Sequence, residues 1–155
     1  MAEKAFQDEI KGNHCWGCSS TNPGGLRIKS HWSEGGSVCV WRPEEIHSAG
    51  PKSVLNGGII ASLIDCHCIC TAIADGYKEE GREIGSGEPI WYATGTLKVT
   101  YKRPTPVDGQ VTLRAQITEK TERKTVLSCT VVAEGEECAV GEIVAIRVPP
   151  DWLES

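Results

Sequence analysis

The sequence lacks an excess of basic residues: 16 lysines and arginines stand against 21 acidic residues, for a formal net charge of −5. Domains that bind a nucleic-acid backbone usually present a clustered basic face, so we expect no nucleic-acid partner. The 17 glycines and 8 prolines form no tract rich in either residue. With 39% hydrophobic residues, this composition excludes a fibrous repeat and a disordered chain. The length of 155 residues predicts a single domain, residues 1–155, with an N-terminal arm over residues 1–13.

A targeting signal and a membrane-spanning run are also lacking. The first ten residues, MAEKAFQDEI, carry acidic side chains and no apolar centre, unlike a secretory signal or a transit peptide. The most apolar stretch, Ile59 to Ala74, is interrupted by Asp65 and His67 and is too short to cross a bilayer. We therefore expect a cytoplasmic protein with no membrane partner, in which this stretch forms a buried core helix.

Cysteine, by contrast, is abundant, with 8 residues. Cys66, Cys68 and Cys70 fall within the predicted helix, where they cannot all find separate disulfide partners without strain. Together with the cytoplasmic expectation, this favours reduced thiols. The cysteines on predicted strands are expected to pack as small hydrophobic residues: Cys39, Cys129 and Cys138.

A metal site remains a minor alternative. Cys15 and Cys18, with His14 beside them, have the spacing of half a zinc site, which usually has a second ligand pair nearby in the sequence. No such pair is evident, because Cys66 and Cys70 share a helix face but lie on a helix predicted to be buried. A thiol redox role for the first pair lacks the expected βαβ context. We therefore expect no metal and no cofactor.

Alternation of apolar and polar residues predicts strands on both sides of the helix. Before it, residues 25–32 and 37–42 are expected to form a hairpin around Glu34, Gly35 and Gly36. The helix should run for about five turns, up to Gly76. Four further strands are predicted around residues 97–101, 111–117, 124–134 and 137–148.

These elements predict an α+β hotdog fold in the order β-β-α-β-β-β-β. Short turns such as Val107 to Gly109 cannot make parallel crossovers, so the four C-terminal strands should be antiparallel neighbours. The helix is apolar nearly all round, and one flat sheet face would leave part of it uncovered. We therefore expect a curved antiparallel sheet that wraps a long central helix.

The residue in the predicted helix that most needs an explanation is Asp65. A carboxylate in the middle of a helix cannot act as a cap and is costly to bury unpaired. Buried carboxylates are enriched at catalytic sites, although structural hydrogen-bond networks give the same signature. At the helix start, Asn56 is a candidate N-cap, and the amides of Gly57 and Gly58 are candidate oxyanion donors.

The spacing of these groups predicts a dimer. Asp65 lies seven residues beyond Gly58, which is about 10 Å along a helix. One substrate carbonyl cannot contact both groups. A site that uses both needs Asp65 from a second subunit, so we expect an obligate twofold homodimer, possibly within a tetramer, with two composite sites.

Two motifs resemble those of the hotdog acyl-CoA thioesterase superfamily, of the 4-hydroxybenzoyl-CoA and phenylacetate-pathway type. They are HSAGPKSVLNGGIIASLID, residues 47–65, and CWGCSSTNPGGL, residues 15–26. The resemblance covers about residues 14–148 and implies an acyl-CoA or related thioester as substrate.

By this resemblance, Asp65 is the general base or the nucleophile of thioester hydrolysis. The amide of Gly57 or Gly58 polarises the thioester carbonyl, and Thr94 or Thr96 orients Asp65 or a water molecule.

The sequence departs from the family pattern at two positions: Asn56 replaces a commoner histidine, and Gly50 stands where some relatives have an asparagine. Asn56 is itself a candidate hydrogen-bond partner of the carbonyl or of water. The departures leave open a protein that binds acyl-CoA without hydrolysing it, and a hydratase or dehydratase is a third interpretation. Further candidates for substrate binding are His47 near the helix start, Lys98, Lys102 and Arg103 for the phosphates, and Trp16, Trp32, Trp41 and Trp91 for an acyl pocket.

Overall fold

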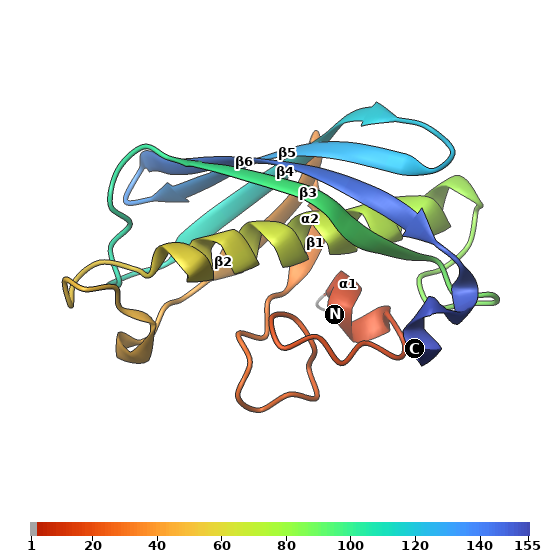
Figure 1. The fold of residues 1–155 in the computed structure, drawn as a ribbon, viewed down its shortest axis with the longest axis horizontal. Helices are drawn as coiled ribbons and strands as arrows, with labels where there is room; N and C mark the ends of the chain where they lie inside the picture. The colour runs from red at the N-terminus through yellow and green to blue at the C-terminus, as the bar shows by residue number, and fades with distance from the viewer. Residues whose placement is uncertain (1–2) are drawn as a thin grey trace.

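A computed structural model describes residues 3–155 and confirms the hotdog fold, with one long helix packed along a curved six-stranded antiparallel sheet (Figure 1). The central helix is α2 (Gly57–Glu79), and the strands are β1 (Ser30–Ser33), β2 (Gly36–Trp41), β3 (Trp91–Tyr101), β4 (Val111–Lys120), β5 (Lys124–Ala133) and β6 (Glu136–Val148). Three short helices complete the fold: α1 (Phe6–Glu9), η1 (Glu45–His47) and η2 (Pro150–Glu154). The predicted order of the main elements is therefore confirmed.

The sheet order is β1-β2-β4-β5-β6-β3, with β1 and β3 at its edges. The expectation that all four C-terminal strands are neighbours is wrong for β3 and β4, because β3 pairs with β6. After Tyr101 the chain passes the start of α2, where Leu55 donates its N–H to the Thr105 carbonyl at 2.8 Å. Val107 then donates to the Ser53 carbonyl at 2.9 Å. These bonds divert the connection to the other side of the sheet, so that within residues 3–155 β3 pairs along one edge only, with β6.

The first predicted strand, residues 25–32, is shorter than expected, because β1 begins only at Ser30. Upstream of it, Leu26 donates its N–H to the carbonyl of Trp16 at 3.2 Å rather than to a strand. Arg27 has a φ of 54°, in the left-handed region that a strand does not adopt. This stretch therefore belongs to a segment outside the sheet.

Residues 3–29, which we call the N-terminal segment, lie on the side of α2 that the sheet leaves open (Figure 1). Within it, Phe6 and Ile10 are buried, and Phe6 packs edge-on against Trp32 with ring centroids 4.9 Å apart. The described part of the predicted arm is thus packed, while residues 1–2 lie outside the described residues. The helix is apolar nearly all round because the sheet packs against one side of it and the N-terminal segment packs against the other.

Helix α2 is longer than predicted, with 23 residues. By length and hydropathy alone it is a candidate membrane span, but most of it is buried between the sheet and the N-terminal segment, as expected of a core helix. Its His67 is fully buried, with Nδ1 at 2.8 Å from the Ser30 hydroxyl and Nε2 at 3.2 Å from the Ser37 hydroxyl. Burial lowers the pKa of His67 to about 4. His67 is therefore a packed histidine, as predicted, and not a partner of Asp65.

Candidate active site

Asp65 projects from the middle of α2 and is only half-buried in the chain. The Thr94 hydroxyl, on β3, donates a hydrogen bond to its Oδ1. Burial raises the pKa of the Asp65 carboxyl, and the hydrogen bond from Thr94 opposes that shift. Among residues 3–155 the carboxylate is thus held by one donor, Thr94, and its second oxygen is left to a ligand or to water.

Asp65 borders a cavity of about 490 Å³, which we call the Asp65 cavity. It lies between α2, β3, the N-terminal segment and η2, and its size is in the range of small-molecule sites. Side chains that suit an apolar ligand surround the carboxylate: Ile69, Trp91, Tyr92, Trp152 and Leu153. The arrangement sets one acidic group against an otherwise mostly apolar wall.

Sequence reasoning identified only part of this wall. Of the four tryptophans proposed for an acyl pocket, Trp91 borders the Asp65 cavity, and Trp16, Trp32 and Trp41 do not. Trp152 and Ser155 were missed. Trp152 lies in the 3-10 helix after the last strand and Ser155 caps that helix, which no periodicity signalled, so no sequence feature placed either residue near Asp65.

The start of α2 forms a second feature. The Asn56 side chain accepts a hydrogen bond from the Ile59 N–H at 3.1 Å, which confirms it as the N-cap. Its oxygen is therefore already engaged with the helix backbone. The Tyr101 hydroxyl, at the end of β3, donates to the carbonyl oxygen of Gly57. Gly58 is exposed, so a ligand can approach the backbone at this end.

A cavity of about 420 Å³ at this helix start, the Gly57 cavity, is bordered by Gly57, Tyr101, Lys102 and Arg103. Lys102 and Arg103 thus lie beside the candidate oxyanion donor. Lys102 pairs with Glu137 at 2.7 Å, and Arg103 pairs with Glu136 at 3.1 Å. The two glutamates partly offset these positive charges. Because exposed ion pairs contribute little free energy, an anionic ligand can replace the glutamates at small cost.

A single chain does not bring Asp65 and the start of α2 together in one site. The Asp65 cavity and the Gly57 cavity share no lining residue, and the helix geometry separates Asp65 from Gly58 by about 10 Å.

The remaining candidate residues line neither cavity. His47 lies beside the helix start, where its Nδ1 accepts the Glu44 N–H at 2.9 Å. Thr96 and Lys98 are exposed on the edge strand β3, and among residues 3–155 no hydrogen bond joins Thr96 to Asp65. Gly50 is exposed in the loop before the helix.

The fold and the site together define a hotdog protein with a carboxylate on its central helix. The chain belongs to the Thioesterase superfamily, whose family model matches residues 52–140, a range that includes both Asp65 and the helix start.

Individual relatives agree with this membership. A thioesterase superfamily protein from Shewanella loihica PV-4 has 30% sequence identity, with a TM-score of 0.67 over 88% of this chain and 96% of that one. A phenylacetic acid degradation-related protein from Ralstonia eutropha JMP134 is 14% identical, with a TM-score of 0.66 over 83% of this chain and 91% of that one, and shows the fold alone. Mouse acyl-coenzyme A thioesterase THEM4 is 27% identical over 106 residues, which are 68% of this chain and 40% of that protein. The chain thus spans less than half of that relative.

Proposed function

We propose that the protein hydrolyses an acyl-CoA thioester, with Asp65 as the general base or the nucleophile. The observation that carries this proposal is a half-buried carboxylate that faces an apolar cavity of about 490 Å³ in a chain of the Thioesterase superfamily. The name of the mouse relative, an acyl-coenzyme A thioesterase, supports coenzyme A as the carrier.

The chemistry asks little of the protein, because a thioester carbonyl is already electrophilic. It requires a group that attacks or activates water, and donors that stabilise the negative oxygen of the tetrahedral intermediate. Asp65 serves as the first group, since its raised pKa makes it a better proton acceptor near neutral pH. Thr94 fixes the orientation of the carboxylate through Oδ1.

A second copy of the chain completes the site in this proposal. Strand β3 has 11 residues and one edge that no described strand pairs with, and such an edge is a template for pairing with another strand. Antiparallel pairing of β3 with β3 of a second copy generates a twofold dimer.

The two ends of β3 are tied to the two halves of the site: Thr94 to Asp65, and Tyr101 to Gly57. A register centred between Leu97 and Lys98 sets Thr94 of one copy opposite the partner's Tyr101. This pairing would bring Asp65 toward the helix start of the other subunit, where an amide can polarise the carbonyl.

The same arrangement assigns the parts of the substrate. The acyl group lies in the Asp65 cavity, against Trp91 and Ile69. The phosphates of coenzyme A lie near Lys102 and Arg103, beside the Gly57 cavity, because phosphate oxygens accept charge-assisted hydrogen bonds from such side chains.

The test is acyl-CoA hydrolysis by the wild type and by Asp65→Asn, with coenzyme A quantified by chromatography because protein thiols would react with a thiol reagent. Removal of the base lowers kcat by about 100- to 10,000-fold. Asp75→Asn is the matched control: Asp75 lies on the same helix, and its carboxylate pairs with Lys120 and does not border the Asp65 cavity. It should retain near-normal turnover.

Equal turnover by the wild type and Asp65→Asn would contradict the assignment of Asp65. Tight binding of acyl-CoA by the wild type without hydrolysis would instead establish the binding-protein alternative. Sedimentation at micromolar concentration tests the composite site, and a stable monomer with full activity would overturn it.

A further inference from the structure

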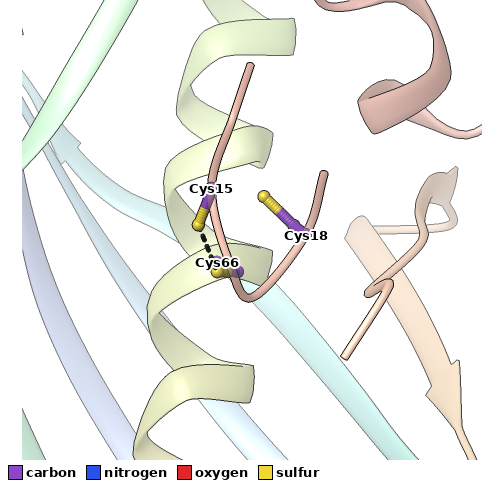
Figure 2. A group of neighbouring side chains, drawn as sticks. All are labelled: Cys15, Cys18 and Cys66. Atoms are coloured by element: carbon purple, nitrogen blue, oxygen red, sulfur yellow. Dashed lines mark hydrogen bonds between the residues drawn. The ribbon is translucent and has the colours of Figure 1, made fainter. Parts of the chain in front are cut away.

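Four thiols that are far apart in the sequence meet on one side of α2. Cys15 and Cys18 come from a loop of the N-terminal segment, and this loop lies on the helix face that carries Cys66 (Figure 2). The sulfur atoms of Cys15 and Cys66 are 3.6 Å apart, and those of Cys18 and Cys70 are 3.8 Å apart. The sulfurs of Cys15, Cys18 and Cys66 all lie within 4.8 Å of one another.

The separations of 3.6 Å and 3.8 Å match two edges of a tetrahedral thiolate site, whereas Cys70 is not among the three sulfurs that lie within 4.8 Å of one another and must turn toward Cys15 and Cys66 to complete it. A Zn–S bond of about 2.3 Å places the sulfurs of such a site about 3.8 Å apart. Cys15 and Cys18 have the spacing of a ligand pair in a loop, and Cys66 and Cys70 are one helical turn apart on the same face. The second ligand pair, which is not evident from the sequence, is thus supplied by the helix.

The loop is shaped for this close approach. A Cβ atom on Gly17 would lie 2.5 Å from the Cys66 sulfur, so a larger residue would push the loop off the helix. Asn13 holds the loop from its other side, accepting the Cys15 N–H at 3.0 Å and donating its amide to the Cys18 sulfur at 3.4 Å. Donors of this kind orient thiolate ligands at metal sites.

Hydrophobic packing accounts for the three buried cysteines, Cys18, Cys66 and Cys70, but not for Cys15. Cys15 is exposed, and an exposed thiol gains little free energy from the removal of apolar surface from water. A role as a ligand explains why an exposed sulfur is held against two buried ones.

We propose that Cys15, Cys18, Cys66 and Cys70 bind one Zn²⁺ ion, in a structural site that fastens the N-terminal segment to α2. Each thiol that becomes a ligand releases one proton, and no oxidant or reductant is needed. Four protein ligands leave no open position on the metal, so the site is closed and has no catalytic role of its own. Because all four residues also border the Asp65 cavity, the metal would fix one wall of that cavity.

The first experiment measures metal content in the full chain, purified with a phosphine reductant and without metal-affinity steps. We expect about one zinc per chain by elemental analysis. Cobalt substitution should give the visible absorption of a tetrahedral cobalt thiolate. Iron in place of zinc would contradict the metal assignment, and a metal-free chain that still takes up no Zn²⁺ when reduced would overturn the site. An intact mass lower by the hydrogens of one or more disulfides, in the chain as isolated without reductant, would show that the thiols pair with each other instead.

Cys15→Ala tests the ligand set with little risk to the fold, because the side chain is exposed. Removal of a residue that hydrogen-bonds to a metal ligand lowers metal affinity by about 10- to 100-fold. Removal of a ligand itself should therefore weaken zinc binding by at least about 100-fold. Cys68→Ala is the matched control, a buried thiol on the same helix that faces Cys129 instead. Its zinc content should equal that of the wild type. Both readouts are independent of thioester hydrolysis, so a failure here and a failure of the proposed enzymatic activity are distinguishable.

Discussion

The two faces of α2 both carry cysteine and use it in different ways. On the face toward the sheet, Cys68 is fully buried beside Cys129 of β5, and Ile64 packs against Gly141 of β6. On the face toward the N-terminal segment, Cys66 and Cys70 meet two further thiols beside a cavity. The same residue type is a small hydrophobic filler on one side and part of a polar cluster on the other. Burial alone does not separate these roles, and the neighbours of each sulfur do.

The largest difference between the faces is expected in their contribution to stability. Ile64 has no exposed surface, and Ile64→Ala should lower the free energy of unfolding by about 2–5 kcal/mol through lost burial and a new cavity. Ile69→Ala is the matched substitution on the other face. Ile69 already borders the Asp65 cavity, so its loss should cost less. Urea unfolding of both variants checks the order, and equal losses would break the comparison.

Gly17→Ala addresses the N-terminal segment alone. The added methyl group would overlap the Cys66 sulfur, and such overpacking costs about 1–3 kcal/mol. Hydrogen exchange should increase over residues 13–19 and remain unchanged in β5. Uniformly faster exchange through the sheet would show that the two faces of α2 unfold as one unit.

On the sheet side, the buried thiol of Cys39 should make the stability of the protein depend on pH. Burial raises the pKa of its thiol from an ordinary value of 9.0 to about 12. Between these values the folded chain keeps a proton that the unfolded chain has lost, so stability falls as pH rises. The contribution is intact below pH 9 and decreases by about 1.4 kcal/mol by pH 10. Unfolding measured at pH 8 and pH 10 should show a steeper loss for the wild type than for Cys39→Ala, and parallel losses would contradict the shift.

The smallest expected effect concerns Thr94, on the cavity side. Thr94→Val removes one donor from a carboxylate that also faces water, which is worth about 1 kcal/mol. We expect kcat for acyl-CoA hydrolysis to fall by about five-fold with little change in KM. Thr96→Val, on the same strand and without a bond to Asp65 among the described residues, is the control. An equal fall in both variants would indicate a general disturbance of β3.

Much of the fold could be predicted from the sequence, because its signals are local. Alternation along β4, β5 and β6 and the unbroken apolar run of α2 each reflect one element and its nearest turn. The position of β3 could not be predicted in this way. It depends on backbone bonds between residues 53–55 and 105–107, and no periodicity reports contacts between two loops.

The residues of the candidate site also differ in whether a local signal in the sequence identifies them. Asp65 and Asn56 could be identified because a mid-helix carboxylate and a cap are unusual or position-specific within one element. The meeting of Cys15 and Cys18 with the helix thiols could not, since it requires the path of the N-terminal segment across α2. Apolar character on both sides of the helix predicts a cover, but no local signal in the sequence says that the N-terminal segment supplies part of it.

The wall of the Asp65 cavity has a practical consequence. Two indole rings, Trp91 and Trp152, border it, and Trp152 is 44% exposed. A molecule that fills the cavity would displace water from these rings and change their fluorescence emission. Ligand screening can therefore begin by optical titration of the unlabelled protein, with Trp152→Phe to assign the signal, before any substrate is known.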